Sequence, residues 1–97
     1  MNVTIRFFTR LREITGKREE TLTFANALTV DLQTVLDCLN NRYGSEFKEY
    51  VFEKESGRVR SFLQFLVNGR NVSTLKGLKT ALNDGDVLAI IPPVGGG

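Results

Sequence analysis

The stretch Val87-Leu88-Ala89-Ile90-Ile91 is the most apolar part of the sequence, and it leads into Pro92-Pro93-Val94 and Gly95-Gly96-Gly97. Five consecutive apolar residues, three of them β-branched, are typical of a strand that is buried on both faces. Asp84-Gly85-Asp86 forms a turn signal before this run, and the two prolines end it because proline donates no hydrogen bond to a sheet. The sequence therefore predicts an interior strand that leads straight into a glycine tail.

The glycine tail allows two interpretations. The last residues of a chain are by default a frayed end. Three features favour a functional tail instead: a core strand lies directly before it, the prolines direct its exit, and no charged residue follows the glycines. We expect a single domain at residues 1–94 and a flexible C-terminal tail at residues 95–97.

Length and composition indicate a small globular protein. A chain of 97 residues is long enough for one domain with a modest core. The apolar content of 41% and the charged content of 25% are close to globular averages, so disorder and membrane spans are not expected. The segment Met1–Arg6 alternates and lacks the apolar run of a signal peptide, which favours a cytoplasmic location.

The residue types argue against an enzyme. The net charge of +2 is too small to imply nucleic acid, and the basic residues near the N-terminus are mixed with glutamates, which is typical of a solvated face. Cys38 is the only cysteine and histidine is missing, so the usual general base, metal ligand and nucleophile pairs are unavailable. There is no glycine-rich phosphate loop. We expect no catalytic residue, metal or bound cofactor.

The first segments read as two strands. Val3, Ile5 and Phe7 alternate with polar residues, which predicts a half-buried strand, and 21–24 alternates in the same way and suits an antiparallel partner. Phe8 is out of phase; it lies either on the open face of the sheet or under a neighbouring loop, and the sequence does not choose. The residues between the two strands, 10–15, are interpreted as a polar turn.

One main helix is predicted at about residues 30–43. Thr29 is a suitable N-cap, and Gly44 a suitable end. Cys38 falls at the border of the apolar stripe, which favours a semi-buried structural thiol over a reactive one. The stripe itself has the spacing of a helix packed on one side and consists of Leu32, Val35, Leu36, Leu39 and Tyr43.

The second half predicts a helical turn, a hairpin and the last strand. Residues 45–59 mix aromatic and charged side chains, and we interpret them as a short helical turn followed by the start of a hairpin. In 59–67 the apolar residues keep a period of two, with Phe62 and Leu66 on the other face. Asn68-Gly69 is a strong signal for a two-residue turn. A short returning strand at 70–72 and a connection at 73–83 complete the chain.

These elements define an α+β fold. A lone helix can bury its stripe only against one face of a sheet. The strand at 87–91, apolar on both sides, belongs in the interior, parallel to the first strand. The order predicts a β-grasp: a mixed sheet of four to five strands with one main helix packed on one face.

Several segments resemble the MoaD-like sulfur carriers, which are ubiquitin-like β-grasp proteins. The resemblance spans nearly the whole chain and is most specific at its C-terminus. Residues 51–57 resemble the longer branch that includes small archaeal ubiquitin-like modifiers. Gly95 stands where the family often has Ala or Ser, so only Gly96 and Gly97 match the shared diglycine. The segments that carry the resemblance are Phe7–Glu13, Leu66–Gly69 and Leu82–Gly97.

The resemblance implies that a ubiquitin-activating-type enzyme adenylates the C-terminal carboxylate of Gly97 with ATP. Sulfide then gives a thiocarboxylate, a sulfur donor for molybdopterin or a related product, whereas a lysine amine gives an isopeptide-linked modifier. The implied partners are that enzyme, a molybdopterin synthase large subunit or lysines of target proteins, and neither nucleic acid nor membrane. We expect the partner-binding residues to be Phe8, Pro92, Pro93, Val94 and Gly95.

Two alternatives remain open at this point. The chain is also compatible with a dedicated small subunit of a molybdopterin synthase, whose tail inserts into the active site of the larger subunit. A plain β-grasp binding module with an inert tail is the other alternative. The sequence does not decide between sulfur carrier and protein modifier.

Overall fold

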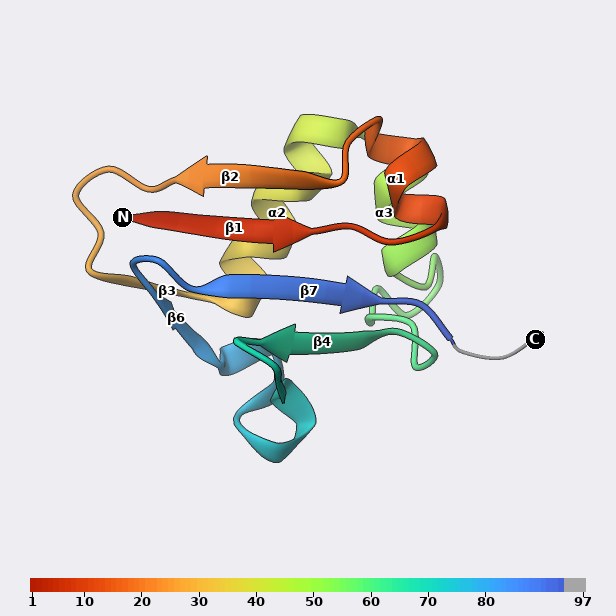
Figure 1. Cartoon of the computed structure of the whole chain (residues 1–97). Coiled ribbons are helices and arrows are strands. Elements are labelled where there is room, and N and C mark those ends of the chain that lie inside the picture. Colours follow the sequence, from red (N-terminus) through yellow and green to blue (C-terminus); the bar gives the residue numbers. More distant parts are fainter. Residues whose placement is uncertain (94–97) are drawn as a thin grey trace.

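The computed structural model describes residues 1–93 and places a mixed sheet in front of the helices α2 and α3 (Figure 1). Within these residues no helix combines the length and apolar character needed to cross a membrane. The helices and strands, in chain order, are β1 (Asn2–Arg6), α1 (Arg10–Thr15), β2 (Glu19–Thr23), β3 (Thr29–Asp31), α2 (Leu32–Tyr43), α3 (Ser45–Val51), β4 (Gln64–Val67), β5 (Arg70–Asn71), the 3-10 turns η1 (Val72–Thr74) and η2 (Gly77–Lys79), β6 (Ala81–Asn83) and β7 (Val87–Ile91).

The strand β7 lies at the centre of the main sheet, whose order is β2-β1-β7-β4-β5. It runs parallel to β1, with Leu88 opposite Ile5, and antiparallel to β4, with Ile90 opposite Phe65. The predicted interior position and the parallel pairing with the first strand are therefore confirmed. The mixed five-stranded sheet also agrees with the predicted fold class.

The prediction that this strand is buried on both faces is wrong. Leu88 and Ile90 are fully buried, whereas Val87, Ala89 and Ile91 are only half-buried. The helices cover one face of the sheet, so alternate residues of β7 meet the core and the others meet the open side. The five apolar residues of β7 therefore lie in two different surroundings, the core on one face and the open side of the sheet on the other.

The core lies between the sheet and α2. The predicted helical stripe is confirmed, because Leu32, Val35, Leu36 and Leu39 are all fully buried. Tyr43 continues this stripe with its ring edge-on to Phe7, at 5.9 Å between centroids. Burial of the stripe against the sheet supplies most of the helix's stability, since isolated helices of this length are marginal in water.

The helix α2 begins two residues later than predicted, and its N-cap is Asp31 rather than Thr29. The Asp31 carboxylate accepts hydrogen bonds from the main-chain N–H and the hydroxyl of Thr34, both at 2.8 Å. Thr29 lies in β3, which pairs with β6, and its hydroxyl donates to the carbonyl of Leu82. A partner strand far along the chain overrides the local cap signal.

Two short helices accompany the main one. Residues 10–15 form α1 rather than a polar turn, because Leu11 is buried and Gly16, at φ 73°, ends the helix in the left-handed conformation. The predicted helical turn after residue 45 is confirmed as α3. The hairpin start is confirmed as a single bridge between Phe52 and Val59.

The predicted turn at Asn68-Gly69 is confirmed and also supports β7. Both residues have positive φ, 49° and 84°, as a tight hairpin between β4 and β5 requires. The Asn68 side chain accepts a hydrogen bond from the Val87 N–H and donates one to Asp86, each at 2.9 Å. This side chain therefore fixes the start of the central strand.

Candidate functional site

The side of the sheet away from α2 and α3, the open face, carries an apolar strip along its centre. The register places Ala89 between Arg6 on β1 and Leu66 on β4, and Val87 beside Thr4. The residues of this apolar strip are half-buried rather than covered. They are Leu66, Val87, Ala89 and Ile91.

Phe8 lies at the end of the apolar strip. Phe7 is fully buried in the core, and its N–H continues the pairing with β2 by donating to Arg18. The next side chain therefore points to the open face, where Phe8 follows Arg6 just as Ile91 follows Ala89 in the neighbouring strand. Phe8 is half-buried, so it is neither free in solvent nor enclosed by a loop.

Arg12 holds Phe8 in place from α1. Its guanidinium carbon lies 5.4 Å from the centroid of the Phe8 ring, and its Nε donates to the carbonyl of Phe7 at 3.0 Å. Such a cation–π contact contributes about 0.5–1 kcal/mol at an exposed site. Thr9, between the strand and the helix, has a positive φ of 44°, and the helix α1 that carries Arg12 begins directly after it.

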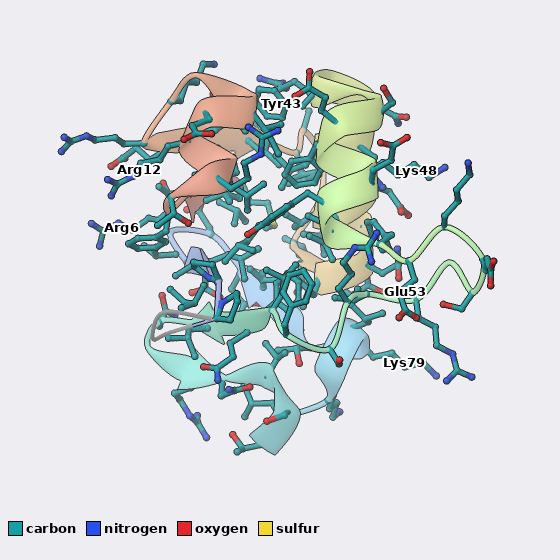
Figure 2. The ribbon with its side chains drawn as sticks, turned by 90° about the vertical axis from the view of Figure 1, so that its right-hand side faces the viewer. Arg6, Arg12, Tyr43, Lys48, Glu53 and Lys79 are labelled. Atoms are coloured by element: carbon teal, nitrogen blue, oxygen red, sulfur yellow. The ribbon has the colours of Figure 1, made fainter. Side chains whose placement is uncertain are left out.

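The open face has a basic rim near Phe8. Arg6 and Arg12 project from the same side of the molecule (Figure 2). Among residues 1–93 neither forms an ion pair, although Glu19 lies opposite Arg6 in the register. Arg10, by contrast, pairs with Glu13 at 2.9 Å. Two arginines are thus available to a partner.

The structure brings three of the predicted site residues to one end of the sheet. β7 runs parallel to β1 and ends at Ile91, so Pro92, half-buried, and Pro93, exposed, follow at the same end of the sheet as Phe8. The other predicted residues, Val94, Gly95, Gly96 and Gly97, lie outside the described residues. Arg12 was missed by sequence reasoning because its role depends on α1, which the polar residues at 10–15 concealed.

Cys38 lies on α2, away from the open face, and is half-buried against the core, as its place in the stripe predicted. Nearby, the Glu20 carboxylate accepts hydrogen bonds from Lys17 and Arg42 and joins β2 to the end of α2. The Lys17 hydrogen bond holds the pKa of Glu20 below its usual value. Burial raises the pKa of Tyr43. Both features lie on the helix side of the sheet.

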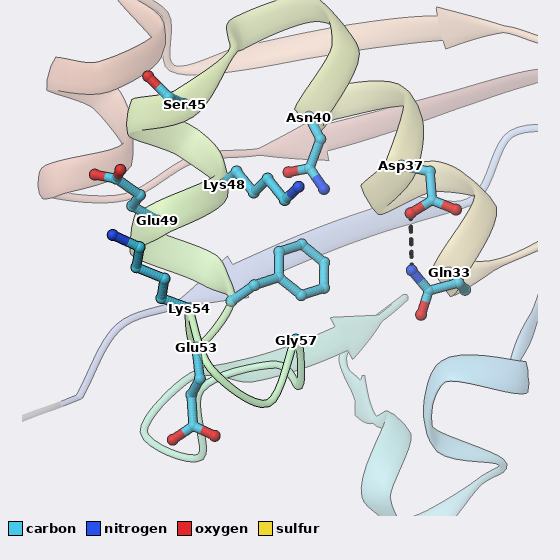
Figure 3. A pocket seen from close by; sticks show the side chains of 10 residues that line it. Gln33, Asp37, Asn40, Ser45, Lys48, Glu49, Glu53, Lys54 and Gly57 are labelled. Carbon is cyan, nitrogen blue, oxygen red and sulfur yellow. Dashed lines mark hydrogen bonds between the residues drawn. The ribbon is translucent and has the colours of Figure 1, made fainter.

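A hollow of about 520 Å³ lies between α2, α3 and the turn at 53–57 (Figure 3). Gln33 donates to Asp37 at 2.9 Å on one wall, and Lys48 points toward Asn40 on another. The lining charges are mixed, and within residues 1–93 no group of metal-ligating side chains gathers. The hollow therefore lacks the organisation of the open face, where an apolar strip is bordered by arginines.

Sequence comparisons match the chain to the ThiS family over residues 5–97. It is 35% identical to small archaeal modifier protein 3 of Haloferax volcanii over 97 residues, the whole of both chains. It is also 32% identical to the sulfur carrier protein CysO of Mycobacterium tuberculosis, again over the whole of both chains.

Solved structures agree. The solution structure of small archaeal modifier protein 1 from Methanosarcina acetivorans superposes with a TM-score of 0.83 at 33% identity, covering 99% of this chain and 96% of that one. CysO in the crystal structure of the BexX/CysO complex of Amycolatopsis orientalis gives 0.73 at 28% identity, covering 98% and 99%. The chain therefore belongs to the ThiS family and is a ubiquitin-like β-grasp protein of the sulfur-carrier and modifier type.

Proposed function

We propose that the carboxylate of Gly97 is the reactive group and that a ubiquitin-activating-type enzyme adenylates it. A carboxylate is a poor electrophile. Its oxygen attacks the α-phosphorus of ATP, pyrophosphate leaves, and the product is an acyl-adenylate. ATP is thus consumed by the partner enzyme rather than held as a cofactor of this chain, which acts as a substrate and not as a catalyst.

The acyl-adenylate has two onward routes. Sulfide attacks the carbonyl carbon, the bond to the adenylate oxygen breaks, AMP leaves, and a C-terminal thiocarboxylate remains. In the other route a lysine amine attacks the same carbon, AMP leaves, the nitrogen loses a proton, and an isopeptide bond forms. Both routes use the same carboxylate in the cytoplasm, so the partner determines the outcome.

The observation that carries this proposal is the position of β7. It is hydrogen-bonded on both sides, and because it runs parallel to β1 it ends at the same end of the sheet as β1, which Phe8 follows. A partner that covers the strip is therefore placed over the exit of the tail. Glycines enter a narrow channel easily because they lack side chains, and any three residues, when fully extended, reach about 10 Å.

The open face suggests the chemistry of that partner. Half-buried apolar residues lie at its centre, and Arg6 and Arg12 border them, so an apolar patch with neighbouring carboxylates fits best. The CysO relative was crystallised in a complex with BexX, which supports a protein partner for this chain. The candidates are the activating enzyme, a molybdopterin synthase large subunit and lysines of target proteins.

The test removes Gly96 and Gly97 and measures ATP–pyrophosphate exchange with the purified activating enzyme from the same cells. The intact chain should support exchange and the truncated chain should not, because its carboxylate falls short of the bound ATP. The melting temperature should stay the same, which separates loss of reactivity from loss of fold. Normal exchange with the truncated chain would overturn the proposal.

Intact-mass analysis of the protein from its own cells distinguishes the two routes. Exchange of one oxygen for sulfur identifies the carrier, and diglycine remnants on lysines of other proteins identify the modifier. If neither is found and the intact chain supports no exchange, the tail is inert and the protein is a plain binding module.

A further inference from the structure

Residues 58–82 carry an unusual charge distribution. This stretch holds five basic residues and no acidic one, although the whole chain has 13 basic and 11 acidic residues. It folds into β4, β5, η1 and η2, which form the lower part of Figure 1. Among residues 1–93 none of the five side chains forms an ion pair. The five are Arg58, Arg60, Arg70, Lys76 and Lys79.

The strand β4 has a free outer edge within this basic region. β5 pairs only with Leu66 and Val67, so the outer side of Gln64 and Phe65 has no neighbouring strand. Along a strand, the main-chain N–H and C=O groups of successive residues point alternately to one neighbouring strand and to the other. The Asn68 N–H donates to the Val87 carbonyl, so the main-chain groups of Leu66 and Gln64 also point to β7. The main-chain groups of Phe65 therefore point away from β7, to the outer side of β4, where β5 does not reach.

A groove of about 400 Å³ follows the free edge. Residues 59–61 and 63–65 line it together with residues 71–73, Gly77 and Leu78. Its floor is apolar, because Leu63, Phe65 and Val72 contribute side chains that are nearly buried, and its rim carries Ser61 and Ser73. The groove therefore combines an unpaired strand edge, an apolar floor and one charged lining residue, the basic Arg60. Lys76 and Lys79 flank the lining residues Gly77 and Leu78 in the sequence.

We propose that this groove binds an extended peptide segment of a partner protein, acidic at its ends and apolar in the middle, which adds to β4 as a further strand. Main-chain hydrogen bonds to a sheet edge give such complexes affinity, and pockets for alternate side chains give them specificity. This site is separate from the open face and from the tail, so the inference goes beyond the proposed function.

The charges select this edge and this ligand. The other edge of the sheet, β2, carries the exposed Glu19, which would repel an acidic segment, whereas Glu20 on the same strand is already paired with Lys17 and Arg42. A nucleic acid is favoured less, because single-stranded nucleic acids bind by stacking on exposed aromatic rings, and Phe65, the aromatic residue that lines the groove, is only 4% exposed. Phe62, 43% exposed, does not line the groove, and its ring packs against Tyr50. An apolar side chain of a peptide suits the floor of the groove better.

The experiment is an NMR titration of the full chain with a short peptide of valines and isoleucines flanked by aspartates. The amide signals of β4 and of residues 71–78 should shift, those of β2 should not, and added salt should weaken binding because the charges are screened. A peptide with lysines in place of the aspartates is the control and should bind far more weakly.

Matched protein variants complete the test. Ser73→Glu puts a negative charge on the rim and should weaken peptide binding about tenfold, since like charges at an interface are unfavourable. Ala25→Glu adds the same charge in the exposed loop between β2 and β3 and should leave binding unchanged. Both variants should support pyrophosphate exchange like the wild type, so this inference and the proposed function fail separately.

Three outcomes would overturn the inference. The first is an unshifted β4 at the highest soluble peptide concentration, and the second is a response at β2 instead. The third is an oligouridylate RNA that shifts the same groove signals with an affinity equal to that of the peptide. The last result would assign the basic region to nucleic acid.

Discussion

Both faces of β7 carry only apolar residues, but the two faces have different surroundings. Leu88 and Ile90 point to α2 and are fully buried, whereas Val87, Ala89 and Ile91 point to the open face and stay half-buried. A strand buried on one face would normally alternate apolar and polar residues. The apolar residues on the open face are therefore more than this fold needs, and on our proposal they serve a partner.

The largest expected effect tests the core face. Ile90→Ala should lower the free energy of unfolding by about 2–5 kcal/mol, because it leaves a cavity in a closely packed core. Ile91→Ala, one residue on, should cost clearly less, since its side chain is only half-buried. Urea denaturation with an unchanged slope measures both. Equal losses would show that the two faces do not differ.

The second prediction tests the open face. Phe8→Ala should weaken binding to the activating enzyme about tenfold, as expected for an aromatic anchor. Stability should change little, because the ring is only half-buried. Calorimetric titration of the enzyme measures the affinity, and Leu28→Ala is a matched control because Leu28 is 92% exposed in a distant loop. Unchanged affinity for Phe8→Ala would remove Phe8 from the interface.

The third prediction concerns the ion pairs of Glu20 with Lys17 and Arg42, which join β2 to the end of α2 on the helix side of the sheet. The pKa of Glu20 is lowered in the folded protein, chiefly by Lys17. Its stabilising contribution is therefore complete above the usual carboxyl pKa of about 4.3 and is lost as the pH falls through the lower, folded value. Glu20→Gln should melt below the wild type at neutral pH. In strong acid the melting temperatures should converge, and a constant gap would contradict this.

The smallest expected effect is that of Cys38→Ser. Cys38 lies on the helix side, away from Phe8 and the end of β7, so it should be a bystander in sulfur transfer and in conjugation. Thiocarboxylate formation, followed by intact mass, should proceed at the wild-type rate. A variant that folds normally but carries no sulfur would prove this prediction wrong.

The sequence predicted those parts of the fold that depend on neighbouring residues. The stripe of α2 and the Asn68-Gly69 turn follow from local spacing and from backbone conformation. The pairing of β3 with β6 does not, because Thr29 and Asn83 meet only in the folded chain. Local rules therefore placed the helix start at Thr29, where a strand lies.

The candidate site shows the same limit. Phe8 and the prolines were predicted from the sequence, but Arg12 was not, because its contact with Phe8 needs the helix α1 where a polar turn was predicted. One signal was available: Leu11 and Ile14 are three residues apart, the spacing of a helix that packs on one side. The half-buried state of the apolar strip depends on which face α2 covers, which the apolar run itself does not reveal.

The central position of β7 also determines how the molecule resists force. A pull on its C-terminal end acts along the strand, in line with the parallel ladder to β1 and the antiparallel ladder to β4. These hydrogen bonds lie across the direction of the pull, perpendicular to the strand on the β4 side and slanted on the β1 side. The force is therefore shared by all of them at once, rather than opening them one after another. An edge strand would peel away under the same load. The chain thus presents its most load-resistant strand to whatever holds its end.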